Sequence, residues 1–195
     1  MKGFALIIVG YQGAGKSLLT KELAKKVHRN RLRILDVYEE YEDFTDIVYR
    51  DNEDLLDKES FIEDMIKEKE KMFITEDATF IFSHRGYDER LVRAIVGKRH
   101  SENIYIFLFH SLRVVPIDVY DFCDELWLLK TADKEKTVLR KYEGTGIEDL
   151  YFAVRDLPEF EWSEKQPVPV RDKHYKVMQI KKGKIDKTVT REPEI

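Results

Sequence analysis

A glycine-rich octapeptide near the amino terminus places the strongest constraint on the fold of this chain. It reads Gly10-Tyr-Gln-Gly-Ala-Gly-Lys-Ser17 and matches the pattern G-x-x-x-x-G-K-[ST] of a phosphate-binding P-loop. A triphosphate needs several inward-pointing backbone N–H donors, and glycines allow a loop to wrap that tightly. The motif requires a buried strand before it and a helix after it. The apolar run Phe4–Val9 and the amphipathic segment 17–27 provide that context.

Each part of the motif has a chemical role. The helix that begins at Lys16 presents the positive end of its dipole to an anion. Lys16 should reach the β- and γ-phosphates of ATP, and the Ser17 hydroxyl should bind Mg²⁺. The residues that we predict to bind the nucleotide are Gly10, Tyr11, Gln12, Gly13, Ala14, Gly15, Lys16 and Ser17.

Apolar strands and amphipathic helices alternate along the rest of the chain. This alternation predicts an α/β fold with a mainly parallel sheet flanked by helices. From the apolar runs we expect further strands at 33–38, 44–49, 72–75, 104–109 and 125–129. From the helical spacing we expect further helices at 58–71, 88–98, 119–122 and 134–142.

The sequence changes character after Leu157. Prolines break any helix there, and two β-type runs at 175–180 and 185–190 flank Gly183, which predicts a β-hairpin that turns at this glycine. We therefore predict a P-loop core at residues 1–157. Residues 158–195 should form a C-terminal extension with the hairpin, packed on the same domain.

The composition is that of a globular protein with a highly charged surface. Of the 195 residues, 43% are hydrophobic and 37% are charged, and the formal net charge of -4 gives no basic footprint for nucleic acid over the whole chain. The single cysteine, Cys123, excludes an intrachain disulfide, which favours a reducing compartment. No run approaches the roughly 18 apolar residues of a membrane span, so we expect a cytoplasmic protein.

Two acidic residues follow the strand at 72–75. In open parallel sheets, ligands bind at the carboxyl ends of the strands, which is where Glu76 and Asp77 should lie. One acid can hold Mg²⁺ together with Ser17, and we assign Glu76 to this role. The other can orient or deprotonate an attacking water, and both are candidate catalytic residues beside Lys16.

A histidine and several arginines surround the strand at 104–109. His110 ends that strand, so it should lie at the same edge as the acids, although a single strand-end histidine is usually structural. Arg85, Arg93 and Arg99 flank or lie within the preceding helix. Any of them can pair with phosphate, but most arginines lie on solvated helix faces.

The order of these motifs resembles the FtsK/HerA type of additional-strand P-loop ATPases. The strongest similarity is to the small genome-packaging ATPases of tailless, membrane-containing viruses, and zonula-occludens-toxin-like assembly proteins are also similar. Only the P-loop is specific in isolation, whereas the other stretches contribute by their order. The stretches that carry the resemblance are 10–17, Ile47–Arg50, Phe73–Ala78, Lys98–His100, Ile104–His110, Val115-Pro116 and Cys123–Leu129.

The resemblance implies an oligomeric Mg²⁺-dependent ATPase that moves double-stranded DNA through a ring, for example a hexamer, and that meets a capsid or portal component. It implies an extra strand between the P-loop strand and the acidic strand. Arg99 becomes the first choice for a finger that reaches into a neighbouring subunit, with Arg93 second. His110 stands where the family has a glutamine that senses the γ-phosphate, and Glu76-Asp77 replaces the usual Asp-Glu.

Three alternatives stay open. A small-molecule kinase also fits the P-loop and the chain length, but the acidic pair suits attack by water and no arginine-rich lid is evident. A GTPase lacks support, since Lys130-Thr-Ala-Asp133 does not match the guanine-reading Asn-Lys-x-Asp pattern. A nucleotide-binding assembly factor without hydrolysis is the third alternative, and His110 in the sensor position is its best support.

Overall fold

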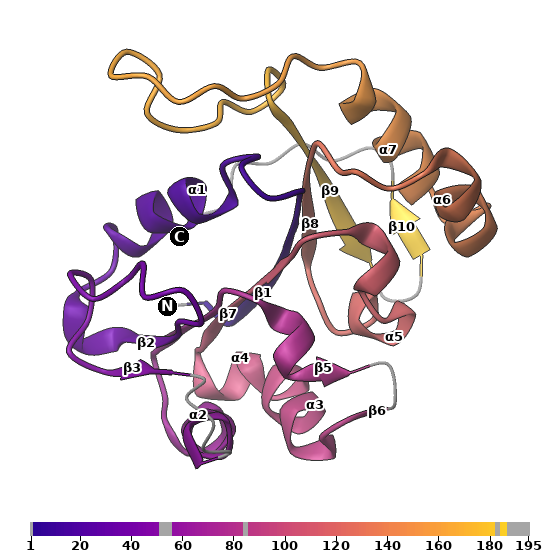
Figure 1. The fold of residues 1–195 in the computed structure, drawn as a ribbon. Coiled ribbons are helices and arrows are strands. Elements are labelled where there is room, and N and C mark those ends of the chain that lie inside the picture. The colour runs from indigo at the N-terminus through magenta and orange to yellow at the C-terminus, as the bar shows by residue number, and fades with distance from the viewer. Residues whose placement is uncertain (1, 51–55, 84–85, 182–183, 187–195) are drawn as a thin grey trace.

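The computed structural model describes residues 2–50, 56–83, 86–181 and 184–186, and it places one large sheet at the centre (Figure 1). The sheet order is β10-β9-β8-β1-β7-β4-β2-β3. A separate pair is formed by β5 (Phe82–Ser83) and β6 (Gly86–Tyr87). The strands of the large sheet are β1 (Phe4–Val9), β2 (Leu32–Leu35), β3 (Val48–Tyr49), β4 (Met72–Thr75), β7 (Ile104–Phe109), β8 (Glu125–Leu129), β9 (Tyr175–Lys181) and β10 (Lys184–Asp186).

The neighbouring strands from β8 to β3 all pair in parallel, whereas β9 runs antiparallel to β8 and β10 antiparallel to β9. The parallel strands are continuous apolar runs because both faces of the sheet are covered. All six residues of β7 are buried, as are five of the six in β1. The mainly parallel α/β fold predicted from the sequence is confirmed.

The position of β7 is the feature that defines this fold. It pairs with β1 on one side and with β4 on the other, so it separates the P-loop strand from the acidic strand. The additional strand that the resemblance implied is therefore present. Val9 lies opposite Phe109, and Thr75 lies opposite Phe107, so the three strands end at nearly the same level.

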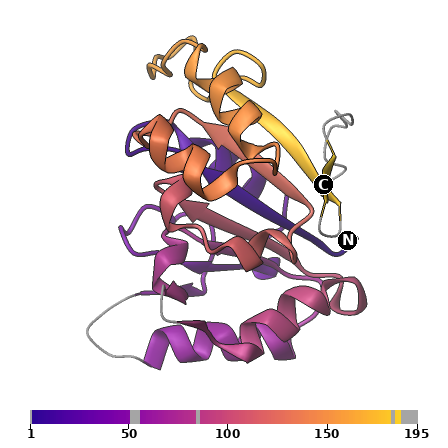
Figure 2. The ribbon, with the colours of Figure 1, turned by 90° about the vertical axis from the view of Figure 1, so that its right-hand side faces the viewer.

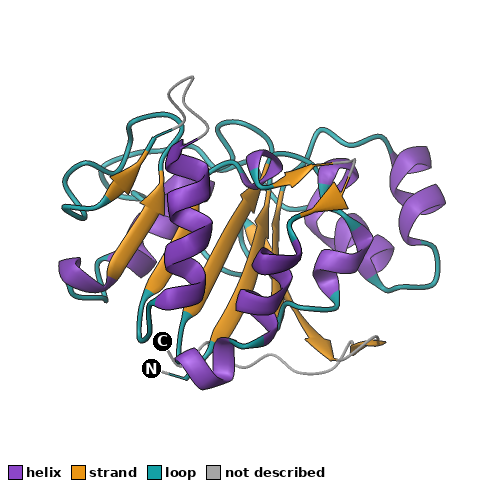
Figure 3. Cartoon of the chain, turned by 90° about the horizontal axis from the view of Figure 1, so that it is seen from below, coloured by secondary structure: helices purple, strands orange, loops and turns teal. Residues whose placement is uncertain are grey.

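Helices cover both faces of the sheet. They are α1 (Lys16–Ala24), α2 (Leu56–Lys67), α3 (Glu89–Val96), α4 (Lys98–Ser101), α5 (Ile117–Tyr120), α6 (Glu135–Tyr142) and α7 (Ile147–Arg155). Helix α1 lies on one side of the sheet, and α5, α6 and α7 lie on the other (Figure 1). Figure 2 shows α2 and α3 side by side at one end of the molecule, and Figure 3 shows helices in front of the strands of the sheet.

Side chains of β1 alternate between two hydrophobic cores, as a strand requires. Ala5, Ile7 and Val9 join the larger cluster, which contains side chains from α2, α3, α5, α6 and α7. Leu6 and Ile8 join the cluster that α1 covers through its leucines. The P-loop thus connects a buried strand to a helix that packs on the same strand.

Several predicted elements differ in their bounds. The strand expected at 33–38 ends at Leu35, because the Asp36 carboxylate accepts the backbone N–H groups of Glu40 and Tyr41 and turns the chain. The helix expected at 88–98 is divided at Gly97 into α3 and α4. Only two residues of the strand expected at 44–49 are in β3.

The carboxyl-terminal part contains one helix that we did not predict and one hairpin that we did. Helix α7 buries Ile147, Leu150, Tyr151 and Val154. Strands β9 and β10 form the predicted hairpin, but its expected turn at Gly183 and the end of its second strand lie outside the described residues. The division of the chain at residue 157 stays a prediction. Among the described residues, no helix has the length and apolar character that a membrane span needs.

The packing of β7 leads to a test of the fold. Phe107 is fully buried, and its ring meets that of Phe82 edge to face at 5.0 Å. We expect Phe107→Ala to lower the free energy of unfolding by about 3–5 kcal/mol, because it leaves a cavity in the central strand. Urea denaturation measures this loss. Val96→Ala, which changes a 59% exposed side chain, should stay within about 0.5 kcal/mol of the unmodified chain. Equal effects of the two substitutions would contradict the placement of β7.

Candidate nucleotide-binding site

The P-loop joins β1 to α1 through a turn that depends on glycine. Gly13 and Gly15 have φ angles of 87° and 92°, in the left-handed region that other residues rarely adopt. Gly15 is the N-cap of α1, so the first N–H groups of the helix have no partner within the helix. The loop is tied down where the Tyr11 N–H donates to the Lys130 carbonyl at 2.8 Å. The result is a rigid helix start that suits an anion.

Lys16 is folded back onto its own loop. Its ammonium donates to the carbonyl oxygens of Gly10 at 2.7 Å and Tyr11 at 3.1 Å, and it lies 3.3 Å from Nδ1 of His110. Burial lowers the pKa of Lys16 to about 8, although the nearby Asp77 and Glu76 oppose this shift. The carbonyls hold the ammonium where a phosphate oxygen can replace them.

Ser17 and Glu76 meet beside the lysine. The Ser17 hydroxyl donates to Oε1 of Glu76 at 3.0 Å, so the two residues assigned to Mg²⁺ are adjacent. Burial raises the pKa of Glu76 to about 8, and the neighbouring Asp36 and Glu40 carboxyl groups add to this shift.

The donor set fits Mg²⁺. No cluster of three or more histidine, cysteine, aspartate and glutamate side chains forms a metal site in the part of the chain that the structure describes. Mg²⁺ needs no such cluster, because one or two protein groups usually hold it together with substrate phosphates and water. The Oε2 atom of Glu76 is buried and has no hydrogen-bond partner among the described residues, so it is available to a metal-bound water.

Asp77 and His110 form a second pair at the same edge. The Asp77 carboxylate accepts from the Thr79 N–H at 3.0 Å and the Thr79 hydroxyl at 2.6 Å, and it lies 3.4 Å from Nε2 of His110. Burial raises the pKa of Asp77, but the nearby His110 and the hydrogen bonds from Thr79 outweigh it, so the net shift is downward. The two ring nitrogens of His110 thus face different groups, with Nδ1 next to the Lys16 ammonium and Nε2 next to Asp77.

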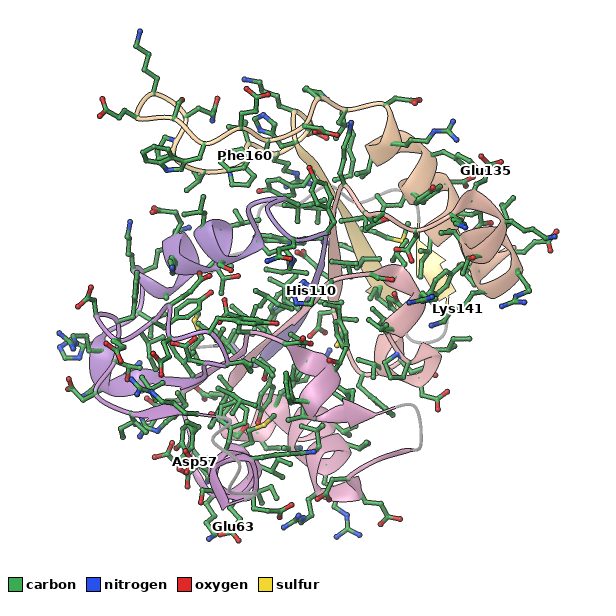
Figure 4. The ribbon with its side chains drawn as sticks, in the orientation of Figure 1. Asp57, Glu63, His110, Glu135, Lys141 and Phe160 are labelled. Atoms are coloured by element: carbon green, nitrogen blue, oxygen red, sulfur yellow. The ribbon has the colours of Figure 1, made fainter. Side chains whose placement is uncertain are left out.

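Lys16, Ser17, Glu76 and His110 line one cavity of about 600 Å³, and Asp77 lies next to His110. Figure 4 labels His110 at the end of β7 and Phe160 in the chain segment that crosses above the P-loop. The structure therefore brings together Lys16, Ser17, Glu76, Asp77 and His110 as neighbours. The cavity is lined by Tyr11, Gln12, Gly13, Gly15, Lys16, Ser17, Leu18, Tyr38, Glu40, Glu76, His110, Phe160 and Trp162.

The arginines lie elsewhere. Arg99 is exposed on α4, which leads into the amino end of β7, whereas the P-loop is at the carboxyl ends of the strands. Arg93 is exposed on α3 and lies 3.6 Å from Glu89. Arg85 lies outside the described residues. Neither described arginine lines the cavity of its own chain.

Several site residues were not anticipated from the sequence. Tyr38 and Glu40 line the cavity from the turn that follows β2, and Phe160 and Trp162 line it from the chain that follows α7. The signal for the last two was the presence of two aromatic residues in a proline- and glutamate-rich stretch. The side chain of Ala14 is buried in the core and its N–H donates to the Tyr11 carbonyl at 3.1 Å, and the contact of Ala14 with nucleotide stays a prediction.

Comparison with solved structures places this geometry among known folds. The DNA-packaging ATPase B204 from Sulfolobus turreted icosahedral virus aligns with a TM-score of 0.66 and 20% identity, over 82% of this chain and 90% of that chain. The genome packaging NTPase B204 from Sulfolobus turreted icosahedral virus 2, in complex with AMPPCP, aligns with a TM-score of 0.69 and 17% identity, over 94% of this chain and 95% of that chain. This chain has the P-loop NTPase fold.

Other comparisons add little. The same NTPase in complex with AMP also aligns with a TM-score of 0.69, at 16% identity over 95% of this chain and 96% of that chain. The N-terminal domain of zonular occludens toxin from Neisseria meningitidis reaches a TM-score of only 0.48, which is too low to support an inference. No protein-family model and no curated protein sequence matches the chain.

The buried glutamate leads to a test by stability. In the folded chain the pKa of Glu76 is about 8 instead of 4.5, so between these values the unfolded chain is ionised while the folded chain keeps the proton. The unfolded state then binds fewer protons, and stability falls as the pH rises through this window. Glutamine avoids this cost. We therefore expect Glu76→Gln to have a higher Tm than the unmodified chain, by a margin that grows from pH 5 to pH 8.

Differential scanning calorimetry with a chelator present measures this margin. Glu89→Gln, at an exposed glutamate of α3, controls for the loss of one carboxyl group. A Tm difference for Glu76→Gln that is identical at pH 5 and pH 8 would contradict the burial of this carboxyl group.

Proposed function

We propose that the chain is a Mg²⁺-dependent ATPase that couples ATP hydrolysis to the movement of double-stranded DNA during viral genome packaging. The observation that carries the proposal is that the P-loop lysine, the Ser17–Glu76 pair and His110 line one cavity, with Asp77 next to His110. Similarity of fold to NTPases named for genome packaging supports it, as do the ATP-γS and AMPPCP complexes of one of them.

Nucleotide binding would replace the carbonyl oxygens around the Lys16 ammonium with phosphate oxygens. The Lys16 ammonium would leave the carbonyls of Gly10 and Tyr11 and pair with the β- and γ-phosphates. The free N–H groups at the start of α1 would face the same anion. Bound Mg²⁺, held through Ser17 and Glu76, would supply positive charge that neutralises the phosphates.

Asp77 is suited to position the attacking water. Its pKa is lowered, so it stays charged and accepts a hydrogen bond, and Thr79 fixes its direction. A weak base is sufficient here, because phosphoryl transfer passes through a loose transition state in which positioning matters more than deprotonation. His110 lies between Lys16 and Asp77 and would sense the γ-phosphate when Lys16 moves. This arrangement favours transfer to water over transfer to a small-molecule acceptor.

Removal of the P-loop lysine tests the chemistry. We expect Lys16→Ala to reduce ATP hydrolysis to background, because the β- and γ-phosphates lose their cation, and we expect double-stranded DNA to stimulate the unmodified protein. The rate of phosphate release from ATP, measured with and without DNA, tests both the loss of hydrolysis and the stimulation by DNA. ATP binding without hydrolysis, under either condition, would instead identify a non-hydrolysing assembly factor. ATP turnover that requires a small-molecule phosphate acceptor would identify a kinase.

A catalytic role for Arg99 would require a second subunit. Arg99 lies at the amino end of β7, away from the cavity of its own chain, so it can reach a γ-phosphate only in another subunit. We propose that it acts as such a finger in a ring of copies. Fingers of this kind contribute roughly 10³ to 10⁵ in rate in other phosphoryl-transfer systems.

Mixing two inactive variants tests the finger. Arg99→Ala and Lys16→Ala should each fail to hydrolyse ATP, because one lacks the finger and the other lacks the phosphate contact. Mixed together they should recover part of the activity, since some interfaces join an intact finger to an intact P-loop. Arg93→Ala, at the exposed arginine that is the second choice for the finger, is tested in the same way. If Arg99→Ala alone hydrolyses ATP normally, the finger assignment is wrong.

A further inference from the structure

The segment between α7 and β9, residues 158–174, crosses directly over the P-loop, and we call it the strap. A Cβ atom placed on Gly15 would lie 2.5 Å from Cγ of Pro169 and 2.8 Å from Cδ1 of Phe160. Both strap residues therefore rest against the P-loop glycine. Figure 1 shows this part of the chain, in orange, extending above α1, and Figure 4 labels Phe160 within it.

Internal contacts give the strap a defined shape. The Val170 N–H donates to Nδ1 of His174 at 2.9 Å, and the Phe160 ring meets the His174 ring edge to face at 5.4 Å. Burial lowers the pKa of His174, which agrees with a neutral ring whose Nδ1 accepts. Ser163 and Gln166 exchange backbone hydrogen bonds at the tip. The strap is thus a structured part of the cavity wall.

The strap presents aromatic faces to the cavity without burying them. Phe160 and Trp162 both line the cavity, and Trp162 is 64% exposed. The other tryptophan, Trp127, is 3% exposed in β8 and stacks on Tyr175 in the core. Packing therefore explains Trp127 but not Trp162. An exposed indole beside a phosphate loop is a surface on which a planar ring can stack.

The charge of the strap bears on which ligand would bind. Glu159, Glu161 and Glu164 are exposed next to the aromatic residues, and Lys165, Arg171 and Lys173 of the strap carry the opposite charge. The strap therefore has no excess of basic residues with which to attract the phosphate backbone of a nucleic acid strand. A nucleobase is uncharged, so stacking of a base needs no such excess. When its phosphates occupy the P-loop, a nucleotide would bring its base into the same cavity.

We propose that Trp162, supported by Phe160, stacks on the base of the bound nucleoside triphosphate and so forms the base subsite. The inference rests on the proposed function, because it requires a nucleotide in the P-loop. Stacking uses the flat face of a base. The subsite would therefore make the affinity for a nucleotide higher than the affinity for a phosphate chain that has no base. Trp162 is the better residue to substitute, because Phe160 also packs on Gly15 and its loss would affect the P-loop itself.

The experiment compares ATP with inorganic tripolyphosphate by calorimetry. We expect Trp162→Ala to weaken ATP binding about 5- to 150-fold, the range for loss of one stacked base, and to leave tripolyphosphate affinity unchanged. Trp162→Phe should restore most of the ATP affinity. ATP, but not tripolyphosphate, should quench the tryptophan fluorescence of the unmodified protein, and Trp162→Ala should lose this quenching. Val170→Ala, at another exposed strap residue outside the cavity lining, is the control and should bind both ligands normally.

The outcomes separate this inference from the proposed function. If the unmodified protein binds ATP and tripolyphosphate while Trp162→Ala binds ATP normally, the base subsite is wrong and the P-loop function stands. An equal loss of both ligands in Trp162→Ala also overturns the subsite, since the strap would then act on the phosphates. Normal ATP binding with loss of self-association, measured by gel filtration, would make Trp162 an interface residue. If the unmodified protein binds neither ligand, both proposals fail.

Discussion

Parallel pairing of β7 with β1 and β4 is the constraint on which the candidate site depends. Each of these strands carries one chemical group just beyond its carboxyl end: the P-loop after β1, His110 after β7 and Glu76-Asp77 after β4. Parallel strands in register end at one edge, so groups far apart in the sequence become neighbours. An antiparallel β7 would carry His110 to the opposite edge, and the contacts that join Lys16, His110 and Asp77 would not exist.

The parts predicted from the sequence were those encoded by local patterns. The P-loop and the buried strands β1, β4, β7 and β8 follow from short apolar runs and one motif, and they were found at their expected positions. The order of the strands is not a local property, and it was predicted only through the resemblance to additional-strand ATPases. The meeting of Ser17 with Glu76 and of His110 with Asp77 followed once that order was assumed.

The parts that were missed depend on contacts between distant residues or on a pattern that we overlooked. Phe160 lies on Gly15 because the chain returns over the P-loop after α7, and an aromatic residue in a polar stretch does not identify the residue that it contacts. Asp36 ends β2 through side-chain bonds to two backbone N–H groups, which an apolar pattern cannot reveal. Helix α7 is different, since the apolar spacing of Ile147, Leu150, Tyr151 and Val154 was readable from the sequence.

The β3 end of the sheet bears on how copies of the chain can associate. The outermost strand there is β3, and it has two residues. An edge strand this short offers few unpaired backbone groups, so a second copy has little template for extending the sheet across this edge. Association at this end would therefore rely on side chains from helices and loops. Such contacts can loosen and re-form without breaking a hydrogen-bonded ladder, which would suit the moving subunits of the ring that we propose.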